Sequence, residues 1–455
     1  AIGYLAIHNQ NTESVAYNTA VGYEAGKLVT TGVRNTLIGG TAGQGLTTGG
    51  ENVAVGYGAL FTDDLGSHNV AVGVSALQNQ NFATATDSHN TAVGYSAGLS
   101  VTTGTQNTLI GAIAGDALTD VDFNTAVGTG ALSTDTLGSK STALGAYALA
   151  NQNLTTATDT HNTAVGNNAG GNVSTGVRNT LIGSLTGDAL TSGGNNTALG
   201  FNALAADTLG SRSVAIGVDA LAAQNFTTTT FNYNIAIGFQ TGAAVTTGTG
   251  QTLIGGLAGD AITTGNNNTA VGFASLSGNQ TGSQNVAVGT QTLNAATGSD
   301  NTAVGMNAGL SVTSGVNNTL IGSLAGDALT TAGNNIAIGY QAHSTDDLGS
   351  RNVSVGTEAL SDMNFATATD SYNVAVGDQA GKRVTTGVRN TFVGGLSGDA
   401  VTDADFNVAV GFNALSTNTV GSKSVAIGHE ALHIQNPATA TNMYNTALGD
   451  QAGYS

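Results

Sequence analysis

The chain has 455 residues, of which 67 are Gly and none is Cys or Trp, and its formal net charge at pH 7 is −18. This charge argues against a nucleic-acid partner, whose phosphates would be repelled, and the lack of Cys excludes disulfides and thiolate metal sites. No apolar run approaches the roughly 18 residues that a membrane-crossing helix needs, so we expect no membrane insertion of this segment.

One five-residue motif that ends in Gly recurs along the whole chain, first at residues 18–22. The glycines follow one another in steps of 17, 17, 17 and 21, and this cycle of three short units and one long unit forms a super-repeat. The first full cycle runs from Gly22 to Gly94, and one step, from Gly289 to Gly305, is only 16. A fixed period of this length is typical of a solenoid. We therefore predict one repeat array over residues 1–455, with super-repeats at about 18–89, 90–161, 162–233, 234–300, 301–372 and 373–444.

Each motif predicts one short β-strand, because β-branched residues at alternate positions precede the Gly. One strand per unit, stacked in parallel at about 4.8 Å, predicts an all-β parallel β-solenoid, or β-roll. It would have about 26 short rungs, where a rung is one turn of the chain. Both faces of the strand are apolar, the pattern of a strand that is covered on both sides. We expect another copy of the chain on the outer face.

Two columns, meaning sets of residues at one position in successive rungs, form a predicted structural ladder. The Gly is expected to supply a backbone angle that other residues avoid. Asn stands four residues before the Gly in 21 of 25 copies, and its amide is expected to bond backbone groups or the next amide of the stack. In the first four full units the ladder is Asn18, Asn35, Asn52 and Asn69 with Gly22, Gly39, Gly56 and Gly73.

The residue just before each Asn belongs to what we call the corner column, which holds seven of the ten basic residues. We predict a corner at which long side chains cover the apolar edge of a neighbouring chain, with ligand contact as the alternative. The candidate surface or interface residues are Arg34, His68, His89, Lys140, Arg178, Arg212, Arg351 and Arg389. The four extra residues of each long unit predict a small loop that stands off the rod and is a candidate binding face.

The unit at residues 407–421, and the Ser-Val-Ala-Ile-Gly strands at 213–217 and 424–428, resemble repeats of two kinds of protein. One is the head of trimeric autotransporter adhesins. The other is the 17-residue repeat array of phage tail fibres and bacterial surface proteins. The resemblance covers the whole chain and implies a β-roll bundled as a homotrimer, located extracellularly, on a cell surface or on a virion. The unit is longer than the usual adhesin-head repeat, and the segment shows no neck, stalk, membrane anchor or chaperone domain. Both ends fall inside a unit, so we expect a longer fibre.

We predict a non-enzymatic fibre or adhesin segment, a shaft or head that provides reach and attachment, with host or cell-surface glycans as candidate partners. We expect no catalytic, cofactor or metal site, and no ligand spacing among the seven histidines. One alternative is a glycan-degrading, tailspike-like enzyme, because paired carboxylates are what a glycosidase uses. The other is an ice-binding solenoid, suggested by Thr pairs such as Thr30-Thr31.

The acidic residues recur with the array, so we predict that they are solvated turn residues, with weak Ca²⁺ binding as their alternative role. The close pairs are Asp63-Asp64, Asp346-Asp347, Asp120 with Asp122, and Asp403 with Asp405. Asp116, Asp188, Asp260, Asp327 and Asp399 each occur once in a super-repeat.

Overall fold

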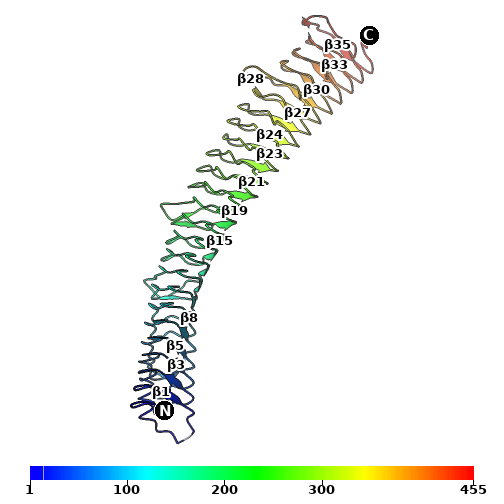
Figure 1. Ribbon diagram of the computed structural model, residues 1–455. Helices are drawn as coiled ribbons and strands as arrows, with labels where there is room; N and C mark the ends of the chain where they lie inside the picture. Colours follow the sequence, from blue (N-terminus) through cyan, green and yellow to red (C-terminus); the bar gives the residue numbers. More distant parts are fainter. Residues whose placement is uncertain (14, 455) are drawn as a thin grey trace. The chain divides into compact units, whose positions relative to one another are not determined.

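The computed structural model describes residues 1–13 and 15–454, and the chain forms two compact units, Ala1–Tyr233 and Asn234–Ser455. Each unit holds three super-repeats, and in each the short strands of successive rungs stack in parallel (Figure 1). The described residues form β-strands and no helix. The prediction of an all-β parallel β-solenoid is therefore confirmed, with 25 three-residue strands and one isolated bridge, between Ile2 and Val21, at the first partial copy.

In the first unit, twelve three-residue strands form the array. Residues of the same column pair between successive strands, as in Thr19 with Thr36 and Val21 with Ile38. These strands are β1 (Thr19–Val21), β2 (Thr36–Ile38), β3 (Val53–Val55), β5 (Val70–Val72), β7 (Thr91–Val93), β8 (Thr108–Ile110), β9 (Thr125–Val127), β11 (Thr142–Leu144), β13 (Thr163–Val165), β14 (Thr180–Ile182), β15 (Thr197–Leu199) and β17 (Val214–Ile216).

The second unit repeats this arrangement with thirteen three-residue strands. They are β19 (Ile235–Ile237), β20 (Thr252–Ile254), β21 (Thr269–Val271), β22 (Val286–Val288), β23 (Thr302–Val304), β24 (Thr319–Ile321), β25 (Ile336–Ile338), β27 (Val353–Val355), β29 (Val374–Val376), β30 (Thr391–Val393), β31 (Val408–Val410), β33 (Val425–Ile427) and β35 (Thr446–Leu448).

The long units add pairs of two-residue strands. The pairs are β4 (Gly66–Ser67) with β6 (Thr86–Asp87), β10 (Gly138–Ser139) with β12 (Thr158–Asp159), β16 (Gly210–Ser211) with β18 (Thr230–Phe231), β26 (Gly349–Ser350) with β28 (Thr369–Asp370), and β32 (Gly421–Ser422) with β34 (Thr441–Asn442). Between β22 and β23, where the shortened unit from Gly289 to Gly305 lies, the described chain has no such pair.

The extra residues fold back onto the solenoid for most of their length. In the first long unit Gln80 and Phe82 are buried, residues 83–85 are exposed, and β6 then pairs with β4 of the preceding rung. Burial of the Phe82 ring stabilises the folded chain relative to a conformation in which the ring is exposed in a loop. The prediction of a loop that stands off the rod is therefore wrong except for the short exposed turn.

The Gly that ends each strand lies where the backbones of successive rungs approach too closely for a side chain. Gly22 has φ 138° and Gly39 has φ 130°, in the left-handed region that Gly tolerates best. A Cβ on Gly39 would lie 2.5 Å from the carbonyl oxygen of Gly56, and one on Gly56 would lie 2.3 Å from that of Gly73. The Gly ladder thus fixes where each rung turns.

The Asn ladder is buried and bonds mainly to the backbone of the next rung. Asn35 Oδ1 accepts from the backbone N–H of Asn52 at 3.0 Å, and Asn35 Nδ2 donates to the carbonyl of Gly49 at 3.0 Å. The same two bonds recur at Asn52, which accepts from Asn69 N–H at 2.9 Å and donates to Gly66 at 2.9 Å. Direct amide-to-amide bonds are fewer, for example Asn69 Nδ2 to Asn52 Oδ1 at 3.2 Å. Each amide therefore joins two rungs and satisfies buried backbone groups.

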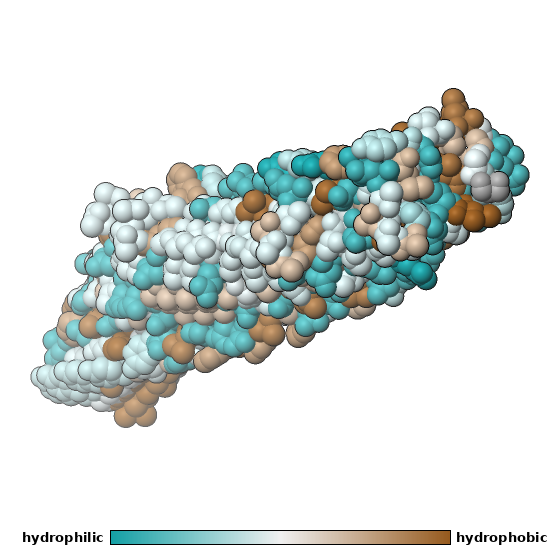
Figure 2. Space-filling model, turned by 90° about the horizontal axis from the view of Figure 1, so that it is seen from above, coloured by the Kyte–Doolittle hydropathy of each residue, from teal (hydrophilic) through white to brown (hydrophobic). Residues whose placement is uncertain are grey.

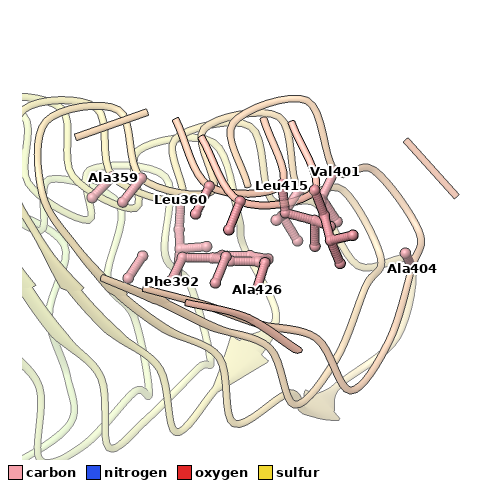
Figure 3. Packing of buried hydrophobic residues seen from close by; sticks show 14 of the residues in the cluster. Ala359, Leu360, Phe392, Val401, Ala404, Leu415 and Ala426 are labelled. Atoms are coloured by element: carbon pink, nitrogen blue, oxygen red, sulfur yellow. The ribbon is translucent and has the colours of Figure 1, made fainter. Parts of the chain in front are cut away.

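The core keeps its volume constant by alternating which wall supplies the large side chain. Leu37 fills the interior from the strand, and Gly26 and Gly43 stand opposite, where a Cβ would come within 2.5 and 2.6 Å of Leu37. One rung on, the strand offers Ala54 and the opposite wall supplies Leu60, both fully buried. In the last super-repeat Phe392 takes the place of the strand Leu. Figure 3 shows Leu360, Phe392 and Leu415 inside the ring that the rungs make.

The glycine corner makes a testable prediction at two adjacent positions. Gly255 has φ 128° and its Cβ would lie 2.6 Å from the carbonyl oxygen of Gly272, whereas a Cβ on Gly256 would meet nothing closer than Phe273 at 3.7 Å. We expect Gly255→Ala to lower the free energy of unfolding by more than about 2 kcal/mol, since it adds backbone strain and a clash. Gly256→Ala should be close to neutral. Equal urea-unfolding midpoints for the two variants would contradict this account of the corner.

Candidate functional site

The outer face of the sheet carries an unbroken apolar column and is only half covered. By outer face we mean the first and third residues of each three-residue strand, since the second is buried. The first residue is Thr, Val or Ile. The third residue is Val, Ile or Leu in every rung, and Ile38, Ile254 and Ile321 are each 38% exposed. Two residues after the third, further exposed rings such as Tyr57 and Tyr95 follow. The face shown in Figure 2 mixes hydrophilic, hydrophobic and intermediate residues.

The corner column lies on an exposed turn in the left-handed conformation, with φ values such as 59° at Arg34 and 63° at His68. Its long side chains reach along the column to the next rung of the same chain. Arg34 pairs with Glu51, Lys140 with Asp159 and Arg351 with Asp370; Arg212 lies over Phe231 and Arg389 over Phe406. Arg178 shares the column, and its backbone N–H donates to Thr160 at 2.8 Å. Exposed pairs of this kind stabilise by at most about 1 kcal/mol each, so they leave the column free to contact a partner.

One part of the corner column gathers metal-ligand side chains. His68 Nδ1 lies 3.1 Å from Asp87 Oδ1, His68 Nε2 lies 3.1 Å from Glu51 Oε2, and the His68 and His89 rings are 5.0 Å apart. The prediction that the histidines show no ligand spacing is therefore wrong for this pair. The step from His68 to His89 equals the length of the long unit, so the sequence contained the signal. Asp87 and Glu51 were not singled out from the sequence.

Asp63 points into the solenoid and is fully buried, so the prediction of a solvated turn is wrong for it. Its Oδ1 accepts from Gly66 N–H at 2.9 Å and its Oδ2 from Gln80 Nε2 at 2.7 Å. Gln80 Oε1 in turn accepts from Asn90 Nδ2 at 2.9 Å. The residue at the Asp63 position depends on the wall that faces the strand. Where that wall supplies Leu60, the apolar space is already full, and the Asp63 position is polar.

The same buried position is polar in each super-repeat, but its hydrogen-bond partner varies. Asp135 pairs with Gln152 and Asp207 with Gln224, while Asn279 and Asn418 hold the turn with their own amides. Asp346 is also fully buried, so the turn prediction is wrong there too. It meets His343 Nε2 at 3.0 Å, in a super-repeat where Met363 stands in place of the Gln. A buried carboxylate needs such donors, since an unpaired one is costly.

Burial sets the protonation of these groups. It raises the pKa of Asp63 to about 6, against the opposing hydrogen bonds from Gln80 and Gly66. Burial likewise raises the pKa of Asp135 and of Asp207. At Asp346 burial pushes the pKa up, but the bond and the charge of His343 outweigh it and leave the pKa lowered.

The other recurrent acids have ordinary structural positions. Asp122 accepts from the backbone and hydroxyl of Thr105, at 2.6 and 2.9 Å, and Asp405 accepts from Val388 N–H at 2.8 Å. These carboxylates cap the rung before them. The once-per-super-repeat acids are partly buried, and burial raises their pKa; they are Asp116, Asp188, Asp260, Asp327 and Asp399.

The Thr pairs use part of their hydroxyl capacity within the solenoid. Thr30 Oγ1 donates to the carbonyl of Thr47 at 3.2 Å, and Thr47 Oγ1 donates to that of Asp64 at 3.1 Å. A hydroxyl that donates to the next rung has no proton left for water. This weakens the ice-binding alternative.

The described surface has hollows, of which two bear on function. One, of about 310 Å³, is polar and is lined by Tyr147, Asn151, Asn168, Asn172 and Asp188 among others. The other, of about 630 Å³, is lined by residues of the last rung, such as Leu432, Ala447 and Leu448. In other rungs these columns are covered by the rung that follows, so this hollow is the open end of the core.

Comparison with known proteins does not identify a family: no protein-family model matches the chain, and no curated protein matches it in sequence. Among the described residues, no helix has the length and apolar character to cross a membrane.

The buried acids make a pH prediction. Because the pKa of Asp63 is raised from 3.8 to about 6 on folding, its contribution to stability is present below pH 3.8 and is lost as pH rises through 6. We expect Asp63→Asn to change stability little at pH 4 and to raise it at pH 7.5, by at most about 3 kcal/mol. Thermal unfolding at both pH values measures this.

Asp120→Asn is the matched control, because it removes the same charge from an exposed turn. Its effect should differ little between the two pH values. If Asp63→Asn and Asp120→Asn show the same pH dependence, the buried position has no special role in the pH response.

Proposed function

We propose that the chain is a structural, non-enzymatic segment of an extracellular or virion-borne fibre, which associates with two further copies of itself and provides reach and attachment. One observation carries this proposal: the outer face of the sheet is apolar and half exposed in rung after rung of both units. Monomeric proteins rarely leave a contiguous apolar surface larger than a few hundred Å² uncovered.

The regularity of the outer face favours a second copy of the chain as its partner. Its apolar residues recur once per rung, at the spacing of parallel strands. A partner that covers such a face over many rungs must present side chains at the same spacing, and another copy of this array does so. Burial of these side chains would supply the hydrophobic free energy of association. The resemblance to adhesin heads favours three copies.

Attachment would use surfaces that association leaves open. The polar hollow around Tyr147 offers amides and a carboxylate that can hydrogen-bond the hydroxyl groups of a glycan. The corner column offers cationic and aromatic side chains on an exposed turn. Both features support a surface-attachment role.

The buried position of Asp63 counts against the glycan-degrading alternative at two of the acid pairs. Asp63 and Asp346 are fully buried, whereas their neighbours Asp64 and Asp347 lie at the wall of the rung. A glycosidase needs both carboxyl groups on either side of one substrate bond. A carboxylate that points into the core, as at Asp63 and Asp346, cannot reach such a bond.

The mass of the purified chain in solution tests the proposal. We expect sedimentation to give three times the chain mass of 44.7 kDa. Replacing two outer-face residues, Ile254→Asp with Val271→Asp, should shift the mass toward one chain, because buried unpaired charges oppose association.

The control is Thr247→Asp with Thr264→Asp, which adds the same charge on exposed turns of the same unit. It should leave the mass unchanged. A wild-type chain that sediments as a stable monomer would overturn the proposal. So would equal masses for the outer-face and the turn variants.

A further inference from the structure

We propose that His68, Asp87 and His89 bind one Zn²⁺-like divalent metal ion at the corner of the first super-repeat, and that Glu51 orients His68 from its other ring nitrogen. The site is independent of self-association, since all of its side chains belong to one chain. These four residues come from three successive rungs, the ones that end in β3, β5 and β7.

The donor atoms already lie close together. One atom each from His68, Asp87 and His89 falls within a group whose members are all within 4.8 Å of one another. Two ligands bound to one tetrahedral Zn²⁺ at about 2.0–2.1 Å are about 3.4 Å apart. The side chains are exposed and carry no packing load, so rotations of their side-chain bonds are enough to close this difference.

The contacts of His68 leave one ring nitrogen for a metal ion. Its Nδ1 lies 3.1 Å from Asp87 Oδ1, and its Nε2 lies 3.1 Å from Glu51 Oε2. An imidazole with one N–H and one lone pair can donate from Nε2 to Glu51 while the lone pair of Nδ1 faces Asp87. A metal ion bound by Nδ1 and Asp87 fits this arrangement, because metal-binding imidazoles commonly donate their other N–H to a carboxylate. The second imidazole, His89, is a further donor beside the first at a ring distance of 5.0 Å.

This combination occurs in one super-repeat, which sets it apart from the recurrent acids. The three positions of His68, Asp87 and His89 become Lys140, Asp159 and His161, then Arg212, Phe231 and Tyr233, then Arg351, Asp370 and Tyr372, and then Lys423, Asn442 and Tyr444. Where Lys140 or Arg351 replaces the first His, a cationic side chain already pairs with the Asp. A positive charge thus stands beside the Asp at Asp159 and Asp370, and a metal ion would supply this charge beside Asp87.

The donor set selects the class of metal. Two imidazoles with carboxylates suit Zn²⁺ and neighbouring transition-metal ions, whereas Ca²⁺ and Mg²⁺ take oxygen ligands. Bound metal would join three rungs and so stabilise the N-terminal part of the array, because a ligand that binds only the folded state raises its stability.

Titration calorimetry of the full chain with ZnCl₂ at pH 7.5 tests the site. We expect one Zn²⁺ per chain, no competition from a tenfold excess of CaCl₂ or MgCl₂, and a higher thermal unfolding midpoint with Zn²⁺. His89→Ala should weaken binding at least about tenfold and abolish the rise in midpoint. His161→Ala, which removes the equivalent ring one super-repeat on, should change neither.

A transplant provides the positive control. Phe123→Glu with Lys140→His, at exposed positions, recreates the three donors together with Asp159 and His161, and adds the carboxylate that orients the first imidazole. This variant should bind two Zn²⁺ per chain.

Three results would overturn the proposal. The first is no Zn²⁺ binding at pH 7.5. The second is equal loss of binding in His89→Ala and His161→Ala, which would show adventitious binding to an acidic protein. The third is a folded transplant variant that still binds one ion.

Discussion

The close approach of successive backbones at the glycine corner is the constraint on which the rest of the structure depends. With a Cβ on Gly39 only 2.5 Å from the next rung, no other residue fits there without strain, and each rung must turn at the same point as its neighbours. Strands therefore pair column on column, Thr19 with Thr36 and Val21 with Ile38. Every side chain then has its own counterpart one rung above and below. The residues of each column must therefore be compatible with one another in size and in charge.

In the interior columns, a large side chain on one wall of a rung is matched by a small residue on the wall opposite. A large residue on the strand, such as Leu37, requires Gly26 and Gly43 opposite, and Leu60 opposite requires Ala54 on the strand. The polar position at Asp63 follows the same logic, because its column neighbours are Leu46 and Gln80, and Gln80 donates a hydrogen bond to it. Where the partner Gln is replaced by Met363, His343 appears in the same rung and bonds Asp346. The four-unit super-repeat is thus the period of the packing of the core.

The period and the strand motif were enough to predict the solenoid, because a glycine marker and a β-branched column are visible in one sequence. Which residues of the polar segment point into the solenoid could not be predicted in the same way. Asp63 sits in a stretch of turn-forming residues, and nothing local distinguishes it from the exposed Asp120. Only the correlation with Leu60, earlier in the same rung, indicates that it points inward. The cluster at His68 was missed for a related reason. Its donors stand in successive units, a full repeat apart in sequence, and become neighbours only when the rungs are stacked in register.

The outer columns obey different rules from the inner ones, and the contrast separates two kinds of surface. The third residue of the strand is Val, Ile or Leu in every rung, although the core behind it changes with a four-rung cycle. This uniformity over a changing core supports the proposed contact with a surface of the same rung period. The corner column changes from Glu51 and His68 to Phe123 and Lys140 one super-repeat on. A column that varies in this way is not part of a uniform interface. It gives each super-repeat its own chemistry, and a single metal site fits there without interrupting the array.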